Sequence, residues 1–267
     1  MSIASSTGTG SAARWGPLWG ARPADWALSE DRQRPTYEAA LKRTGLEPGW
    51  HVLDIGCGAG AFLRLIADGR AEPHGIDASE ALIAFSRDRL PAADLRVGEM
   101  EELPWDDDSF DLVTGFNSFF FANDMVAALR EASRVAKPGA PVVIQVWGAH
   151  EHCDFEAMKQ IARPFFPPRP PDAPQDPDFS EPGVLEALAT RAGLIVESEF
   201  DSTWVIEYPD AQTLGRAMLA VAGLAVLVGP EHEHELETAI VDGLAPFRTA
   251  DGAYRFSNEY RFLIARA

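Results

Sequence analysis

Asp54 and the three glycines that follow it have the residue types and spacing of a nucleotide-binding turn. The segment His51-Val-Leu-Asp-Ile-Gly-Cys-Gly-Ala-Gly60 starts as a short apolar run and ends in glycines spaced two residues apart, and a mainly apolar stretch follows. This order predicts a buried strand, a tight turn and a helix. Glycine lets the backbone turn sharply and lets a ligand lie against the main chain. Asp54 precedes the turn near the carboxyl end of the strand, where open α/β sheets bind ligands.

A second acid, Asp77, ends the next predicted strand, Pro73-His-Gly-Ile-Asp77, about twenty residues beyond the glycines. In dinucleotide-binding folds an acid at this distance hydrogen-bonds the ribose hydroxyls, because a carboxylate accepts from two neighbouring hydroxyls at once. A lone acid at a strand end could equally be a solvated residue. The distance from the glycine turn favours ribose binding.

Alternating strands and helices are predicted to position these acids. Strands are expected around residues 52–55, 73–77, 95–100, 112–116 and 141–147, and the helices between them include 61–67, 80–90 and 125–135. About five strand-then-helix units in succession predict a parallel, doubly wound sheet. Two later strands, within 194–208 and 258–265, complete an α/β fold with a mainly parallel seven-stranded sheet.

The segments outside this alternation are predicted to form a tail and caps. Residues 1–13 are mostly Ser, Gly, Thr and Ala and are expected to be disordered, which leaves 14–267 as a single domain. The segments at about 148–182 and 209–250 are expected to form helical caps or lids. Trp15 and Trp19 directly follow the tail, so they are expected either to pack this segment onto the domain or to close over a ligand.

The amino-acid composition indicates which classes of molecule this protein could bind. A formal net charge of -18 argues against binding a nucleic-acid backbone, which needs clustered Lys and Arg. The two cysteines cannot make a disulfide framework, and no basic-then-apolar leader opens the chain. The longest apolar segment, 217–229, is too short to span a bilayer. We therefore expect a cytoplasmic protein that binds a small molecule and neither nucleic acid nor a membrane.

The motif Asp-x-Gly-x-Gly-x-Gly resembles motif I of the class I S-adenosylmethionine (SAM) dependent methyltransferases, and four later segments match the same family in register. They are Gly75–Ser79, Val97–Pro104, Ser109–Val113 and Leu129–Gly139. The ending, from Pro246 to Arg261, resembles the UbiE-like group that methylates small molecules. One departure is Glu99, where the family more often has Asp. The resemblance implies a Rossmann-like methyltransferase fold.

The resemblance also implies a cofactor site. The glycine turn would pass under the methionine part of SAM, Asp54 would lie near its ammonium group, and Asp77 would take the ribose hydroxyls. Glu99 and Met100 would flank adenine, and the residues after the fourth strand would face the sulfonium. The complete implied set is Asp54, Gly56, Cys57, Gly58, Gly60, Asp77, Ala78, Ser79, Glu99, Met100, Phe116, Asn117 and Ser118.

The implied reaction is in-line methyl transfer from SAM to an O, N or C atom of a small, apolar or aromatic acceptor, leaving S-adenosyl-L-homocysteine. Proximity and orientation could supply much of the catalysis, with a general base only if the acceptor carries a proton. His150 and His152 follow the fifth strand and are candidate bases, although surface histidines are common. Candidate pocket walls are Trp15, Trp19, Trp147, Phe165, Phe166, Trp204 and Met218.

There are two alternative functions, and the sequence excludes the first of them no better than it excludes a methyltransferase. A protein that binds SAM without turnover would carry the same cofactor motifs. An NAD-dependent oxidoreductase would need a third glycine where Ala61 stands, and no Tyr-x-x-x-Lys set appears. No metal site is expected, because the histidines of His232-Glu-His-Glu235 are two apart and would diverge by roughly 200° on a helix.

Overall fold

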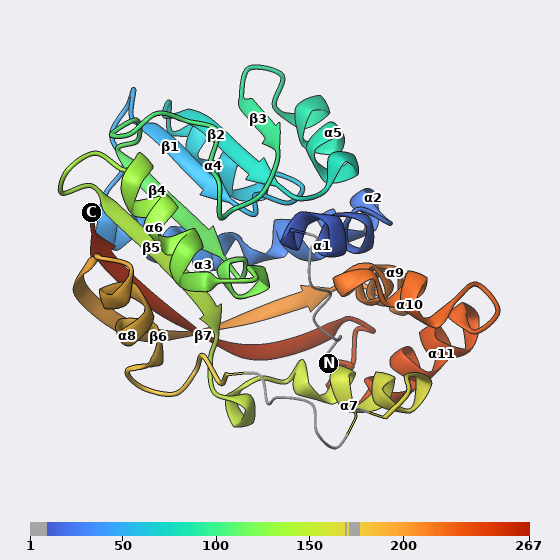
Figure 1. Cartoon of the computed structure of the whole chain (residues 1–267). Coiled ribbons are helices and arrows are strands. Elements are labelled where there is room, and N and C mark those ends of the chain that lie inside the picture. Colours follow the sequence, from blue (N-terminus) through green and yellow to red (C-terminus); the bar gives the residue numbers. More distant parts are fainter. Residues whose placement is uncertain (1–9, 169, 171–176) are drawn as a thin grey trace.

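The protein folds around one seven-stranded sheet (Figure 1). The structure is a computed structural model that describes residues 10–168, 170 and 177–267. The strand order is β3-β2-β1-β4-β5-β7-β6, in which β7 runs antiparallel to both neighbours and β1 to β5 are parallel. The strands are β1 (His51–Ile55), β2 (Glu72–Asp77), β3 (Asp94–Val97), β4 (Leu112–Phe116), β5 (Pro141–Trp147), β6 (Ile195–Tyr208) and β7 (Tyr254–Arg266).

Helices cover both faces of the sheet, which confirms the predicted doubly wound α/β fold. α6 (Met125–Val135) and α8 (Val184–Arg191) contribute to the apolar core on one face. α3 (Arg34–Thr44), α4 (Ala61–Asp68) and α5 (Glu80–Arg89) contribute to the other. Successive residues of β1 alternate between the two cores, as expected of a strand that is buried on both faces.

The predicted ends of helices and strands agree best with the structure where turn or helix-capping residues interrupt the apolar pattern. The Ser79 side chain accepts a hydrogen bond from the Leu82 backbone N–H at 3.1 Å, as expected of the residue that caps α5. The third strand ends at Val97 rather than Met100, where the chain enters a turn. β7 begins at Tyr254, earlier than residue 258, because it pairs along the whole outer half of β6.

Two short helices precede α3 and cover the tips of the parallel strands, namely α1 (Ser11–Trp19) and α2 (Pro23–Glu30) (Figure 1). The expectation of disorder up to residue 13 is wrong for residues 11–13. Ser11 Oγ donates to Glu99 Oε2 at 2.6 Å, and the Ala12 N–H donates to the same oxygen at 2.9 Å. These bonds to the loop after β3 order the start of α1. Residues 1–9 lie outside the described part of the chain.

The expected cap segments contain further helices. α7 (Glu156–Ala162) lies between β5 and β6, and α9 (Ala211–Ala220), α10 (Leu224–Val228) and α11 (Glu233–Gly243) lie between β6 and β7. Figure 1 shows α7 and α9 to α11 gathered at one end of β6 and β7, away from β1 to β3. Their buried side chains join the same core as α3 and α4.

One stretch within these caps, Ala211–Val228, has a mean hydropathy of 1.6 and by length and composition alone could cross a membrane. Ala222 and Gly223 adopt positive φ values of 49° and 71°, so the stretch is two helices separated by a turn. Residues such as Leu214 and Met218 are fully buried against the rest of the protein. The stretch therefore has the contacts of a core helix.

Candidate functional site

The glycine turn after β1 has a conformation that requires glycine. Gly56, Gly58 and Gly60 have φ values of 76°, 54° and 80°, in the left-handed region that side chains disfavour. The N–H groups of Gly56 and Cys57 both donate to the Ile76 carbonyl oxygen, at 2.8 and 3.0 Å, so the turn is tied to the end of β2. The turn thus lies at the carboxyl edge of the sheet, where the sequence predicted it.

Asp77 orders the same turn from the end of β2. Its Oδ2 accepts from the Gly58 N–H at 2.9 Å, and its Oδ1 accepts from the Ser79 N–H at 2.8 Å. Burial raises the pKa of Asp77, and these two N–H groups oppose that rise. The structure therefore brings Asp77, the glycine turn and Ser79 together.

Asp54 lies beneath the turn in the interior of the sheet. Its side chain is 4% exposed and accepts from Thr114 Oγ1 on β4 at 2.7 Å. Burial raises the pKa of Asp54 well above its ordinary value, the Thr114 bond opposes this, and the negative charges of Glu30 and Asp77 raise it further. A positive ligand group at this point would favour the ionised carboxyl.

Glu30, the last residue of α2, is a site residue that the sequence did not indicate. It is 5% exposed, and its two carboxylate oxygens accept from the N–H groups of Ala59 at 2.6 Å and Ala61 at 2.7 Å. Ala61 begins α4, so the carboxylate lies at the helix N-terminus, where the helix dipole favours a negative charge. Burial raises the pKa of Glu30 from 4.5 to about 7 in spite of these bonds.

Glu30 also leaves no room for a side chain at position 58. A Cβ on Gly58 would lie 2.4 Å from Glu30 Oε2 and 3.1 Å from Trp26 Nε1. Arg89 is the nearby cation. It donates to the Ala59 carbonyl oxygen at 2.9 Å and pairs with Asp31, and its charge lowers the pKa of Glu30 only in part. Two buried carboxyl groups, Glu30 and Asp54, and the half-buried Asp77 therefore surround one glycine turn.

Asn117 and Ser118, which follow β4, present unused polar atoms beside the turn. Among the described residues, neither the Asn117 amide nor Ser118 Oγ has a hydrogen-bond partner, although all three atoms are buried. Buried polar atoms are rarely unpaired. Asn117 also has a φ of 51°, and such backbone strain in a residue other than glycine is found preferentially at binding sites. A Cβ on Gly56 would lie 2.4 Å from Ser118 Cβ, so Ser118 borders the turn directly.

α1 covers the residues that the sequence placed at ribose and adenine. A Cβ on Gly16 would lie 2.3 Å from the Ala78 carbonyl oxygen, and one on Gly20 would lie 2.1 Å from Ser79 Oγ. Glu99 accepts the two bonds from the start of α1 described above. Met100 is half-buried and packs against the core on the α6 face. Part of the predicted cofactor edge is therefore in contact with α1.

The aromatic pocket candidates fall into two groups. Trp15 packs edge-on against Phe121 with ring centroids 4.7 Å apart, and Trp19 packs against Trp26 at 4.6 Å, so this pair lies with α1 over the turn. The others belong to the core that α7 and α9 to α11 share with the sheet: Trp147, Phe165, Phe166, Trp204 and Met218. Phe116 also joins that core, and its ring lies 4.7 Å from the Tyr37 ring.

The second group surrounds further unpaired polar atoms. In the described part of the chain, no partner is found for the buried Gln145 side-chain amide, Tyr260 Oη or Trp204 Nε1. Gln145 on β5 pairs in register with Phe262, two residues from Tyr260 on β7, and Tyr260 pairs with Ser202, two residues from Trp204 on β6. The alternation of side chains along a strand places all three on one face of the sheet. No local sequence pattern indicated this cluster.

His150 and His152 lie on the surface after β5. Their side chains are 63% and 59% exposed, with His150 Nδ1 3.0 Å from Glu156 Oε1 and His152 Nδ1 3.0 Å from Glu259 Oε2. His152 and Glu259 line a polar cavity of about 450 Å³. None of these contacts involves the glycine turn, and a role as general base stays a prediction.

Comparison with known proteins associates the segment from β1 into β5 with one family. A family model described as a methyltransferase domain matches residues 53–144, which run from β1 into β5. A demethylmenaquinone methyltransferase of Beutenbergia cavernae is 31% identical over 131 residues, which are 49% of this chain and 55% of the relative. A malonyl-[acyl-carrier protein] O-methyltransferase of Dechloromonas aromatica is 29% identical over 228 residues, 77% of this chain and 79% of the relative.

The first curated relatives that match the chain are matched over about half of their own length. Among solved structures, the [4+2]-cyclase SpnF is similar with a TM-score of 0.57 and 20% identity, over 87% of this chain and 79% of that one. At that identity the likeness shows the fold alone.

Proposed function

Because the chain belongs to the class I SAM-dependent methyltransferases, we propose that it transfers the methyl group of SAM to an O, N or C atom of a small, apolar or aromatic molecule. The observation that carries this proposal is the glycine turn surrounded by the buried Glu30 and Asp54 and the half-buried Asp77. Burial raises the pKa of Glu30 and Asp54, and a positive partner would favour their ionised forms. SAM carries two positive groups, an ammonium and a sulfonium, and supplies an activated methyl group when bound.

The residues present fit this cofactor. Asp77 would accept from the ribose hydroxyls, and Asp54 and Glu30 would compensate the positive charges. Asn117 and Ser118 have buried polar atoms with no partner among residues 10–168, 170 and 177–267, and would pair with the methionine part or with the acceptor. Cofactor binding also requires α1 to yield space at Ala78 and Ser79, which it now contacts.

For the acceptor, we propose the core face beneath the cap helices. Gln145, Tyr260 and Trp204 offer polar atoms there, and Trp147 and Phe155, whose ring centroids lie 5.7 Å apart, offer aromatic walls. Apolar walls with a few polar groups are typical of small-molecule sites. These residues would bind and orient the acceptor and exclude water, and His150 or His152 would take a proton if the acceptor carries one.

The relatives support methyl transfer but differ in the acceptor, since a malonyl group is a carboxylate and is carried on a protein. Their names indicate demethylmenaquinone for one and a malonyl group on acyl-carrier protein for the other.

Both cysteines are free and buried, which is consistent with the proposed cytoplasmic location.

Thermal unfolding with cofactors tests the binding step. SAM and S-adenosyl-L-homocysteine at micromolar concentration should raise the melting temperature of the wild type, and NAD should not. Asp77→Ala should weaken binding of S-adenosyl-L-homocysteine roughly tenfold to a hundredfold, because a charged hydrogen-bond acceptor is worth about 1.5–3 kcal/mol. Circular dichroism checks that the variant is folded. A response to NAD alone would refute the proposal, and unchanged affinity in Asp77→Ala would remove Asp77 from its role.

Turnover needs a separate experiment, because a protein that binds SAM without using it is the second candidate. The protein is incubated with SAM labelled in the methyl group and a metabolite extract. Label should pass to a small molecule with the wild type, and much more slowly with Asp77→Ala at the same micromolar SAM concentration. Tight cofactor binding without transfer to any acceptor would favour the binding protein.

A further inference from the structure

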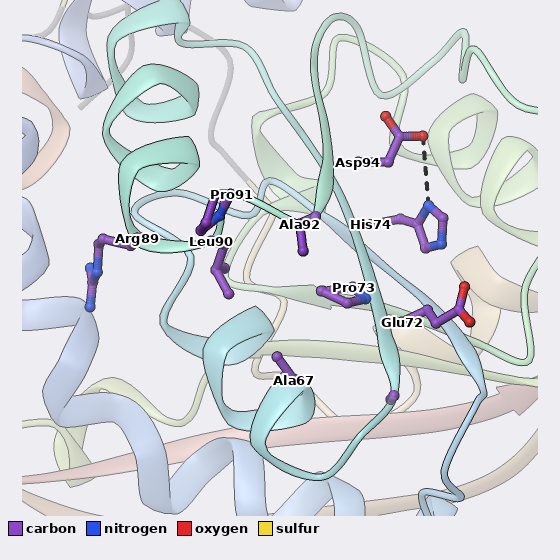
Figure 2. A pocket seen from close by; sticks show the side chains of 11 residues that line it. Ala67, Glu72, Pro73, His74, Arg89, Leu90, Pro91, Ala92 and Asp94 are labelled. Atoms are coloured by element: carbon purple, nitrogen blue, oxygen red, sulfur yellow. Dashed lines mark ion pairs between the residues drawn. The ribbon is translucent and has the colours of Figure 1, made fainter.

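Two histidines and a glutamate converge at the amino ends of β1 and β2, at the opposite edge of the sheet from the glycine turn. His51 and Glu72 are the first residues of their strands and are partners in the parallel register. His74 follows Glu72 by two residues, so its side chain leaves the same face of β2. Figure 2 shows Glu72 and His74 side by side along β2.

The ligand atoms of these residues have the separations of a metal site. His51 Nδ1 lies 3.2 Å from His74 Nε2 and 3.5 Å from Glu72 Oε2. Each of the three residues offers one ligand atom that lies within 4.8 Å of those of the other two. A tetrahedral Zn²⁺ with bonds of about 2.0–2.1 Å holds neighbouring ligand atoms roughly 3.3 Å apart. The two shorter separations match that value without movement of the side chains.

A carboxylate stands behind His74, as it does behind many metal-binding histidines. His74 Nδ1 is buried, and its nearest acid oxygen is Asp94 Oδ2 at 3.6 Å, the pair joined by the dashed line in Figure 2. Asp94 is itself fixed by Arg96 at 2.7 Å and by Trp105 Nε1 at 3.0 Å. An acid in this place favours a proton on Nδ1 and leaves the lone pair of Nε2 facing His51 and Glu72.

The cluster also opens to solvent on one side. Glu72, His74 and Asp94 also border a cavity of about 460 Å³ with the segment from Arg89 to Ala93, although the Glu72 and His74 side chains point away from that segment (Figure 2). The His74 side chain is 18% exposed, against 44% for His51 and 60% for Glu72. A metal ion held by these three groups could therefore keep water as a fourth ligand.

We propose that His51, Glu72 and His74 bind one Zn²⁺ or similar divalent transition-metal ion, which links β1 to β2 at the edge of the sheet away from the cofactor. Two imidazoles and one carboxylate are the donors that such ions prefer. The other histidine–acid pairs of the described chain, such as His152 with Glu259, offer one imidazole each. They provide matched controls.

The test uses the full chain without an affinity tag and freed of metal by a chelator. Co²⁺ is added, and its visible absorption reports tetrahedral coordination. One equivalent of Co²⁺ should produce intense absorption bands, and added Zn²⁺ should displace the Co²⁺ and remove them. His51→Gln and His74→Gln should each abolish the one-to-one signal, and Asp94→Asn should weaken binding about 10–100-fold. His152→Gln should bind Co²⁺ as the wild type does.

Several results would overturn the proposal. These are the absence of stoichiometric binding by the wild type, binding retained by the His51→Gln, His74→Gln double variant, and binding lost on His152→Gln. Circular dichroism of each variant separates loss of ligands from loss of the fold. The melting-temperature rise caused by S-adenosyl-L-homocysteine should persist in His74→Gln, so the metal site and the cofactor site are tested independently.

Discussion

Replacing Glu30 by glutamine should change how the stability of this protein depends on pH. The Glu30 carboxyl is buried, and its pKa rises from 4.5 to about 7 on folding, chiefly through desolvation. Between these two values the folded state binds more protons than the unfolded state. The contribution of Glu30 to the free energy of unfolding is therefore fully present below pH 4.5. It falls as the pH rises toward and past 7.

The shift sets the size of the effect. A rise from 4.5 to about 7 corresponds to about 3.4 kcal/mol in total. About 2.5 kcal/mol of that falls between pH 5 and pH 8, because the titration is incomplete at both ends. Glutamine does not titrate, but it offers only one carbonyl oxygen to Ala59 and Ala61, a loss of about 1–3 kcal/mol that does not depend on pH.

Urea unfolding of both proteins at pH 5, 6, 7 and 8 measures this. The free energy of unfolding of Glu30→Gln minus that of the wild type should rise by about 2.5 kcal/mol from pH 5 to pH 8. Groups that titrate alike in the two proteins cancel in the difference. Glu38→Gln, which removes an exposed acid of α3, is the control and should give a much flatter difference. A difference for Glu30→Gln that is as flat as the control would refute the buried, protonated state of Glu30.

Two further substitutions test the turn and its neighbours. Gly58→Ala should destabilise the protein by more than about 2 kcal/mol and remove binding of S-adenosyl-L-homocysteine, because its Cβ would lie 2.4 Å from Glu30 Oε2. Gly139→Ala is the control, because Gly139 has a similar positive φ of 79° but a Cβ there would meet nothing within 4 Å. Calorimetry should show that it lowers the free energy of unfolding by only about 1 kcal/mol. Equal losses for the two substitutions would contradict the steric argument. Asn117→Ala should change the melting temperature little, because the loss of an amide without a partner among the described residues offsets the cost of Ala at a φ of 51°, while methyl transfer falls about tenfold or more. A marked loss of stability with normal transfer would show that Asn117 serves the fold instead.

The fold could be predicted in detail because its evidence is local. The apolar run of β5 stops at Trp147, and α6 ends at Val135 before Lys137-Pro-Gly139, so strand and helix boundaries are marked by neighbouring residues. The glycine turn and Asp77 were predictable for the same reason. Their role depends on backbone conformation and on the end of the strand to which they belong, and both are encoded within a few residues.

The site was predicted less completely where it depends on distant segments. The residue types before Asp54 do not show that α1 folds back onto Ala78 and Ser79. They also do not show that Ser11, taken from composition for part of a disordered tail, would bond to Glu99. A contact of this kind is decided by how a whole helix packs, for which no short pattern exists.

The sequence by itself therefore determined the sheet, the turn and the acid beside it, because hydrophobic alternation and glycine act over a few residues. Only the tertiary structure decided that Glu30 caps α4, that His51 meets Glu72 and His74, and that Gln145, Tyr260 and Trp204 share one face. These groups come from separate elements, and their positions depend on strand register and helix packing. The physical reason is that burial and electrostatics act between atoms that are close in space, whatever their separation along the chain.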